Sequence, residues 1–447
     1  MPHNLSDAIF TTHEMRDIFS PLAQLRAMLR FEWALGCALE EHGIIAPGCS
    51  DAVASLSDTA FVDCDRLERE AVSAGNIAIP FLTQLTDALT ATNLAAAGSL
   101  HFGATSQDLL DTALVLQMRD AFTVIASKLA RLDRALVDQS QSHNSTVMLA
   151  RTWLQAGPPT TLGLKLAATL AALRRSATRI RAAQAHMIVL QFGGAVGTLS
   201  ALGDKGEAVS RSLAAKLELD EAAVPWHSHR DNIAEVAASL ATLLGTLGKL
   251  AYDIALLMQT EVSEVSEASH DGKGSSSTMP HKHNPVNCAA IVAAAKRAPG
   301  LTAILLGSII QEHERGMGSW QTEWAALPEL FCLADGALTH SIDLIENLIV
   351  HRDRMRANIE ATRGLPMAEA VAVALARKIG RPQAHALLRV AVESAIARQS
   401  TLAAVLKTMP EVRTHLSDAE IDELLTPENY LGSARCFVRK VTGDANS

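Results

Sequence analysis

The sequence predicts an all-α protein of three helical domains, whose central bundle of long helices assembles with other subunits into one helical core. Apolar residues recur at alternating spacings of three and four over long stretches, and no stretch shows the strict alternation of a half-buried strand or a βαβ rhythm. Hydrophobic residues make up 48% of the chain. Charged residues make up 19%, below the usual fraction of roughly 25%. Long apolar helices with so few charges indicate water-free helix contacts, some of them between subunits.

The first two domains differ in the length of their helical patterns. Residues 1–110 are expected to form an N-terminal domain, because their short patterns are broken by PGCSD and AGNIAIP. Residues 111–355 carry long seams with heptad spacing, which predict helices of about 25 residues or more, roughly 40 Å long. The seams are Met118, Phe122, Ile125, Leu129, Leu132 and Leu136; Leu162, Leu166, Leu170, Leu173, Ala177 and Ile180; and Ile233, Val236, Leu240, Leu243, Leu247, Leu250, Ile254 and Leu257.

Glycines and breakers organise the rest of the chain. The segment QFGGAVGTLSALGD at 191–204 follows no predicted strand, so we interpret it as a turn between long helices and not as a nucleotide site. Gly245 and Gly248 lie beside the third seam and predict close approach of a neighbouring helix. Residues 356–447 are expected to form a C-terminal domain of short helices, broken by RGLPM and KIGRPQ.

Charge and cysteine usage restrict the location and the partners. The formal net charge of −9 argues against nucleic acid and anionic membranes as partners. The six cysteines are scattered without a CxxC pair, which indicates reduced thiols in a cytoplasmic protein. The start, MPHNLSDAIF, does not resemble a secretory signal, and no run approaches the ~18 apolar residues of a membrane span. An anionic substrate would therefore need cations concentrated locally at its site.

The segment HFGATSQDLLDT at 101–112 interrupts the helical rhythm with polar residues. Thr105 and Ser106 precede a helix start, where hydroxyls and free backbone N–H groups suit a carboxylate. An ordinary turn with an N-cap would have the same sequence, so both interpretations stay open.

Two further polar segments precede long helices. ARTWLQAGPPTT at 150–161 places Gln155 before a helix, and by itself it is a helix entry. PWHSHRDNIAE at 225–235 places Arg230 just ahead of the third seam, where a surface cap is an equally good interpretation.

The segment GKGSSSTMPHKHNPVNCA at 272–289 carries the strongest chemical signal. Its glycines and serines predict a mobile loop, and Asn284 with Pro285 has the N-cap and N1 chemistry of a new helix. Lys282 then lies just ahead of a helix N-terminus, where the ammonium and the helix dipole both favour a negative ligand. An anion docked there would order the loop and close the site. The HxH pair in this loop lacks a suitably spaced carboxylate, so we expect no metal.

The stretch SSTMPHKHN at 276–284 resembles the signature S-S-x-M-P-x-K-x-N of the fumarase/aspartase superfamily, with six fixed residue types among nine positions. The TSQD, RTWLQ and HRDN segments resemble its other active-site regions in order and spacing, so the resemblance covers essentially the whole chain. It implies a fumarase/aspartase-like all-α fold and a homotetramer whose central helices share one core. It also implies active sites built from segments of three chains. No cofactor is expected.

Two departures narrow the expected reaction. The elimination enzymes of the superfamily usually carry a proton-handling His where this chain has Trp153, and its Glu partner where this chain has Ala289. Their loss argues against a fumarate-releasing lyase. The cycloisomerase branch resembles this chain at both positions and in the phrases MRDIFS, LQFGGAVGTLSALG and QEHERGMGSW. The resemblance therefore implies intramolecular lactonisation of 3-carboxy-cis,cis-muconate to 4-carboxymuconolactone in aromatic (protocatechuate) degradation.

The same resemblance assigns roles to individual residues. Ser276, matched to the superfamily's loop serine, is expected to transfer the proton. Lys282 and Asn284 would hold the carboxylate that takes up the developing charge. Thr105 and Ser106 would bind a second carboxylate, Gln155 would orient the substrate, Trp153 would shape the pocket, and His101 and Arg230 would neutralise charge, with His101 the next candidate for proton transfer.

Three other interpretations remain open. A relative acting on another substituted muconate, such as 3-sulfomuconate, would share these motifs. A fumarate-releasing lyase of the adenylosuccinate lyase type shares HFGATSQD and QEHER. Trp153, Ala289 and Trp324, the last where a phosphate-binding arginine is expected, oppose that activity. A catalytically silent scaffold, like the lens proteins of the superfamily, is opposed by the intact loop that contains Ser276 and Lys282.

Overall fold

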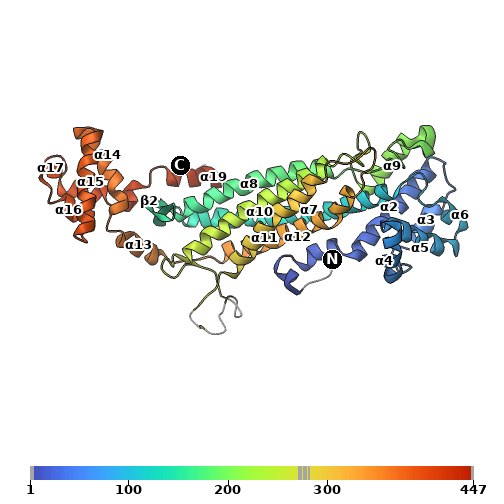
Figure 1. Ribbon diagram of the computed structural model, residues 1–447, viewed down its shortest axis with the longest axis horizontal. Helices are drawn as coiled ribbons and strands as arrows, with labels where there is room; N and C mark the ends of the chain where they lie inside the picture. Colours follow the sequence, from blue (N-terminus) through green and yellow to red (C-terminus); the bar gives the residue numbers. More distant parts are fainter. Residues whose placement is uncertain (1–4, 270–273, 275–278, 280–281, 444–447) are drawn as a thin grey trace. The chain divides into compact units, whose positions relative to one another are not determined.

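Helices dominate the computed structural model, which describes residues 5–269, 274, 279 and 282–443 (Figure 1). This confirms the predicted all-α class. Five helices are long, and Figure 1 shows their segments running side by side. They are α7 (Ser106–Ser142), α8 (Leu162–Met187), α10 (Asp231–Leu257), α11 (Val286–Gly307) and α12 (Ser319–Glu346).

The three predicted seams lie in α7, α8 and α10. Along α10, Leu240, Leu243 and Leu247 are completely buried, and the other five seam residues are at most 3% exposed. Burying one such side chain stabilises the fold by about 1.5–3 kcal/mol. The seam residues of α10 are therefore buried, as their spacing predicted.

Two of the long helices, α10 and α11, are apolar and long enough to span a membrane, with mean hydropathies of 1.4 and 1.5 over their most apolar windows. However, α10 carries ion pairs on its surface, such as Glu235 with His186 and Lys249 with Asp253, which do not suit hydrocarbon. Only 28% of the apolar window of α11 is buried. A Cβ on Gly245 would meet no atom of the described residues within 4 Å, so no neighbouring helix of the described chain approaches closely at this position. Half of the apolar window of α10 and most of that of α11 are therefore exposed in the described single chain.

The chain divides into two compact units, and all five long helices contribute segments to both. The three domains expected from the sequence stay a prediction beside this division. The first unit comprises Met1–Leu129, Ser176–Gly245 and Ala293–Thr339, and the second comprises Ala130–Arg175, Thr246–Val292 and His340–Ser447.

Short helices complete the first unit, and side-chain caps set where several begin. Ser20 accepts the Ala23 N–H at the start of α2, and Pro21 occupies the first helical position. Thr12 caps α1 in the same way. The elements are η1 (Leu5–Ile9), α1 (His13–Ile18), α2 (Pro21–Glu41), α3 (Cys49–Ala54), α4 (Cys64–Ala74), α5 (Ala78–Thr90), α6 (Leu94–Ser99), η2 (Ser200–Lys205) and α9 (Gly206–Leu217).

A β-hairpin in the second unit was not predicted. Strands β1 (Val147–Thr152) and β2 (Gln155–Thr161) pair antiparallel, where we expected a helix entry at 150–161. β2 is not predictable from its sequence, because it contains Gly157, Pro158 and Pro159, and glycine and proline are rare in strands. A two-stranded sheet tolerates them, since each strand has a free edge. A second short pair joins β3 (Val265–Ser266) to β4 (Ile349–Val350).

Short helices follow β4, with breaks at the expected places. Gly364 and Gly380 have φ angles of 79° and 81°, which explains why RGLPM and KIGRPQ end helices. Val371, Leu375 and Leu388 lie in a common buried cluster between α14 and α15. The elements are α13 (Arg352–Ala361), η3 (Leu365–Met367), α14 (Ala368–Ile379), α15 (Arg381–Ala397), α16 (Leu402–Leu406), α17 (Pro410–Arg413), α18 (Asp418–Leu424), η4 (Pro427–Tyr430) and α19 (Ala434–Thr442).

Candidate active site

A buried carboxylate organises the start of α7. Asp108 is completely buried and accepts the N–H of Thr105 at 3.0 Å. It also accepts the N–H groups of Gly193 and Gly194 at 3.0 and 2.9 Å, and His227 Nε2 lies 2.6 Å from it. The glycine-rich segment thus lies against the first turn of α7. Because the Asp108 carboxylate accepts the backbone N–H at this helix start, the Thr105 hydroxyl is available to other partners.

Arg315 is the partner of that hydroxyl, and the sequence analysis did not assign it a role. Its Nη1 donates to Thr105 Oγ1 at 2.9 Å, and its Nη2 donates to the carbonyl of Ala195 at 2.9 Å. Its Nε is buried without a hydrogen-bond partner among the described residues. Because neutral oxygens hold it, Arg315 keeps its positive charge for a ligand. The QEHER phrase was the signal that could have identified it.

His101 lies beside Thr105 and Ser106 on a cavity of about 520 Å³. Its Nδ1 is 2.6 Å from Glu32, whose side chain is completely buried, while 17% of the His101 side chain is exposed. Burial alone would lower the pKa of His101, but the Glu32 carboxylate outweighs burial and raises it. The structure therefore brings three predicted site residues together, His101, Thr105 and Ser106, with Arg315 attached to the second.

Arg230 lies in the same unit but presents no free cation. It is 1% exposed, and its guanidinium binds Asp111 at 2.7 and 3.0 Å and Glu323 at 3.1 and 3.2 Å. The Trp226 ring lies 4.7 Å from its centre. Burial raises the pKa of Glu323 although Arg230 acts in the opposite direction. The expectation that Arg230 meets the substrate is therefore corrected: its two carboxylate partners already neutralise it.

The hairpin of the second unit presents Trp153, Leu154 and Gln155 at its tip. Trp153 and Leu154 have φ angles of 53° and 62°, in the left-handed region that bulky side chains rarely adopt. They are 97% and 75% exposed, and Gln155 is exposed as well. Below the tip, Arg151 binds the buried Glu264 at 2.7 and 3.0 Å. A two-residue hairpin turn favours positive φ at both central residues, and bulky side chains held in that conformation are strained, which makes this tip a candidate part of the site.

The signature loop is closed at its base by its own backbone. The Asn284 N–H donates to the carbonyl of Gly274 at 2.8 Å. Gly274 has a φ angle of 73°, and a Cβ on it would lie 2.6 Å from the Asn284 oxygen, so only glycine fits there. Lys282 is exposed and forms no ion pair with a described residue. The predicted proton donor, Ser276, lies outside the described residues.

The N-terminus of α11 differs from our expectation. The helix begins at Val286, so Asn284 is not its cap, and the carboxylate of Glu267 accepts the N–H groups of Asn287 and Cys288 at 3.1 and 3.0 Å. Glu267 is 8% exposed and already compensates the helix dipole. Attraction of an anion near this loop must therefore come from Lys282 itself.

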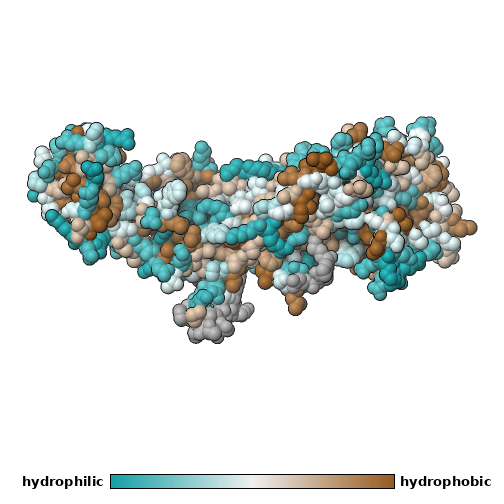
Figure 2. All heavy atoms as spheres, viewed as in Figure 1, coloured by the Kyte–Doolittle hydropathy of each residue, from teal (hydrophilic) through white to brown (hydrophobic). Residues whose placement is uncertain are grey.

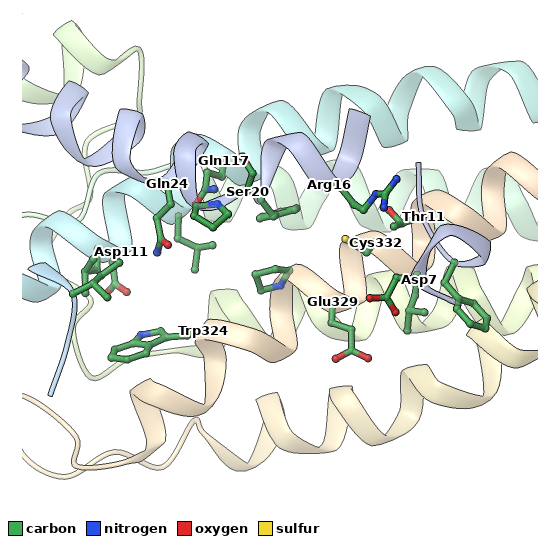
Figure 3. Close-up of a pocket in the computed structure, with 18 of the residues that line it drawn as sticks. Asp7, Thr11, Arg16, Ser20, Gln24, Asp111, Gln117, Trp324, Glu329 and Cys332 are labelled. Atoms are coloured by element: carbon green, nitrogen blue, oxygen red, sulfur yellow. The ribbon is translucent and has the colours of Figure 1, made fainter. Parts of the chain in front are cut away.

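A second cavity of the first unit, about 620 Å³, lies between α1, α2, α7 and α12 (Figure 3). Figure 3 shows Trp324 near Asp111 at one end. Three acidic side chains (Asp7, Asp111 and Glu329) and two basic ones (Arg16 and Arg297) line this cavity, and Arg297 is already paired with Glu329, so the cavity offers no excess of positive charge to an anionic substrate. Trp324 also supplies no cation for a phosphate. We therefore assign the site to the Thr105 cavity.

The predicted site residues fall into two groups. The first unit holds His101, Thr105, Ser106 and Arg230, and the second holds Trp153, Gln155, Lys282 and Asn284. Within the first group, only Arg230 is separated from the cavity by its own ion pairs.

Comparison with known proteins shows the same fold and motifs. A family model described as "Lyase" matches residues 13–300, and one described as "Adenylosuccinate lyase C-terminus" matches residues 364–441. The 3-carboxy-cis,cis-muconate cycloisomerase of Pseudomonas aeruginosa is 44% identical over 99% of this chain and 96% of its own length. That of Acinetobacter baylyi is 41% identical over 98% of both chains. The crystal structure of the 3-carboxy-cis,cis-muconate lactonizing enzyme from Pseudomonas putida has a TM-score of 0.94 and 42% identity, covering 99% of both chains. The chain is therefore an enzyme that belongs to the lyase family, within the fumarase/aspartase superfamily.

Proposed function

We propose that this enzyme catalyses the lactonisation of 3-carboxy-cis,cis-muconate to 4-carboxymuconolactone, a step of the β-ketoadipate pathway. The observation that carries the proposal is the absence of a titratable pair at positions 153 and 289. Trp153 stands at the hairpin tip, and Ala289 lies exposed in the first turn of α11. Relatives with this activity match the chain over nearly its whole length.

The proposed reaction needs no external nucleophile. One carboxylate oxygen of the substrate bonds to an alkene carbon, and the π electron pair moves towards the conjugated carboxylate. One proton from solvent ends on the adjacent carbon, so a trianion becomes a dianion. Ring closure gains from proximity, because both reacting groups belong to one molecule. The enzyme must stabilise the developing charge and deliver the proton.

The cations and hydroxyls have separate roles in this proposal. Thr105 and Ser106, with Arg315, bind one carboxylate beside His101. Lys282 and Asn284 bind the carboxylate that takes up the developing charge, and Ser276 delivers the proton. A serine hydroxyl is a poor acid at neutral pH, so a nearby ammonium is required. Gln155 and Trp153 orient and enclose the substrate from the hairpin tip. Arg230 links α7 to α12 through its ion pairs with Asp111 and Glu323.

A homotetramer with shared sites fits the surfaces of the single chain. Figure 2 shows patches of apolar side chains on the face drawn, and Ile304, Leu306 and Ile310 are exposed on or just after α11. Complete burial of one such side chain at an interface stabilises the assembly by about 1.5–3 kcal/mol, which favours association. The open faces of α10 and α11 and the exposed Trp153 would pack against other subunits. All six cysteines are free, in keeping with a cytoplasmic location.

Loss of diene absorbance tests this function directly. Purified protein mixed with 3-carboxy-cis,cis-muconate is expected to remove the ultraviolet absorbance of the diene, without forming fumarate. A weakly buffered indicator should report one proton taken up per molecule consumed. Fumarate release from adenylosuccinate, or no change with either compound, would contradict the proposal. Parallel assays with 3-sulfomuconate measure the preference between substituents.

Replacing Arg315 with glutamine is expected to raise KM about 10- to 100-fold. The variant loses a charged hydrogen-bond donor beside Thr105, and such bonds contribute about 1.5–3 kcal/mol. Steady-state kinetics with 3-carboxy-cis,cis-muconate measure the effect. Arg413→Gln is the matched control, since the ion pair of Arg413 among the described residues is a long one, 4.0 Å from the exposed Asp418. An unchanged KM in Arg315→Gln would remove this residue from the site.

A further inference from the structure

A buried glutamate holds His101 at the edge of the proposed substrate cavity. Glu32 on α2 accepts the backbone N–H of His101 at 3.1 Å and lies 2.6 Å from its Nδ1. Because one carboxylate binds both the amide and the ring, His101 is held in a left-handed conformation with φ 58°. Its other ring nitrogen, Nε2, forms no hydrogen bond with a described residue. His101 lines the cavity together with Thr105 and Ser106.

Three other charged groups surround His101. Asp108 on α7 acts on it through space, and Asp87 on α5 lines the same cavity. Arg315 donates to the neighbouring threonine and adds positive charge on that side. Asp108 is already bound by another histidine and three backbone N–H groups. Glu32 is therefore the carboxylate in direct contact with the ring, and it raises the pKa of His101 more than Asp108 does.

We propose that Glu32 is a positioning residue that holds the His101 ring at Nδ1 and turns Nε2 to a substrate carboxylate, so that the pair forms a pH-sensitive anion subsite. The inference deepens the proposed function and rests on it for the nature of the substrate, a small tricarboxylate. With His101 protonated, the pair has no net charge and offers a donor. Once His101 loses its proton, the pair carries one negative charge and offers none.

The direction of the pH dependence follows from this charge balance. Glu32 outweighs burial, so His101 stays protonated to a higher pH than an isolated histidine. Anion binding is then strong below the transition and weakens as pH rises through it. Above the transition, each bound anion requires one proton from solvent, which adds to Nε2 of His101. Without the Glu32 charge, the whole transition moves to lower pH.

Calorimetry with tricarballylate (propane-1,2,3-tricarboxylate) tests the subsite without relying on turnover. Binding to the full-length protein is measured from about pH 7 to about pH 9.5, where the probe is a trianion. Two buffers of different ionisation enthalpy give the number of protons taken up per site. Wild-type binding is expected to weaken as pH rises, while the proton uptake increases towards one per site.

Two variants separate positioning from a merely structural role. In Glu32→Gln, the weakening and the proton uptake should begin at lower pH than in the wild type, because the carboxylate that favours the charged ring is lost. His101→Asn keeps the left-handed backbone, which Asn tolerates, and should abolish the proton uptake. Glu41→Gln is the matched control on the same helix; Glu41 is exposed and contacts Ser212 and Lys216, so the wild-type profile should persist.

Four results would overturn the subsite: no tricarballylate binding by the wild type near pH 7, an unshifted profile in Glu32→Gln, unchanged proton uptake in His101→Asn, or a shift in the control. If Glu32→Gln does not fold, as judged by circular dichroism, His101→Asn alone decides. The diene assay is independent of this measurement. A protein that binds the probe with the expected profile but does not consume 3-carboxy-cis,cis-muconate would keep the subsite and lose the proposed reaction.

Discussion

Replacing Ser276 with alanine is expected to lower kcat for 3-carboxy-cis,cis-muconate by about 10²–10⁴-fold, the usual contribution of a positioned proton donor. KM should change little, because Lys282 and Arg315 still bind the carboxylates. The variant loses the group that delivers a proton to the carbon beside the new ring. It keeps the charges that stabilise the developing anion, so slow protonation by water remains. Steady-state kinetics from the loss of diene absorbance measure the effect.

The neighbouring serine provides the control for this variant. Ser275→Ala changes the same loop but lies outside the signature at 276–284, so its kcat should stay near that of the wild type. Size-exclusion chromatography should show the same assembly for both variants. Near-normal turnover in Ser276→Ala would transfer the proton delivery to His101. A loss of assembly would instead indicate that the loop is a packing element.

Replacing Arg230 with methionine is expected to destabilise the protein by about 3–5 kcal/mol, the usual cost of leaving buried charges unpaired. Asp111 and Glu323 would both remain in the interior, where their side chains are at most 2% exposed. Trp320 would still donate to Asp111 at 2.9 Å, but one indole cannot neutralise two carboxylates. Chemical denaturation measures the free energy of unfolding. Where unfolding is irreversible, the half-life at a fixed temperature replaces it.

A matched arginine shows whether the burial of the pair is the cause. Arg211→Met removes an exposed pair with Glu207, whose side chains are 64% and 82% exposed, and should cost less than about 1 kcal/mol. Adding Glu323→Gln to Arg230→Met should recover part of the loss, because it removes one unpaired charge. A cost below about 1 kcal/mol for Arg230→Met would mean that water reaches this pair.

The long helices and the superfamily resemblance of the segment 276–284 were predictable from the sequence. A heptad seam such as that of α10 repeats within one segment, so its burial follows from local spacing wherever the helix packs. The resemblance of 276–284 to a superfamily signature likewise needs only adjacent residues. The absence of His and Glu at 153 and 289 was also readable position by position, and it carries the proposed reaction.

Other features were decided by contacts between residues far apart in the chain. Gln155 is the first residue of a strand, because the proline-containing segment 155–161 pairs with β1. The N-terminus of α11 is bound by the carboxylate of Glu267, which is 20 positions before Asn287 in the chain and reaches this helix only in the folded protein. No local pattern marks such a pairing, since the order of residues does not state which side chains tertiary packing brings together.

The sequence by itself determined the helical class and the family, because periodicity and adjacent motifs are properties of neighbouring residues. Only the tertiary structure decided which charges are free to act. It paired Arg230 with two carboxylates 119 and 93 positions away, left Arg315 beside Thr105 across 210 positions, and joined His101 to Glu32 across 69. The physical reason is that the availability of a charge depends on its nearest counter-charge in space, which packing sets and sequence distance does not.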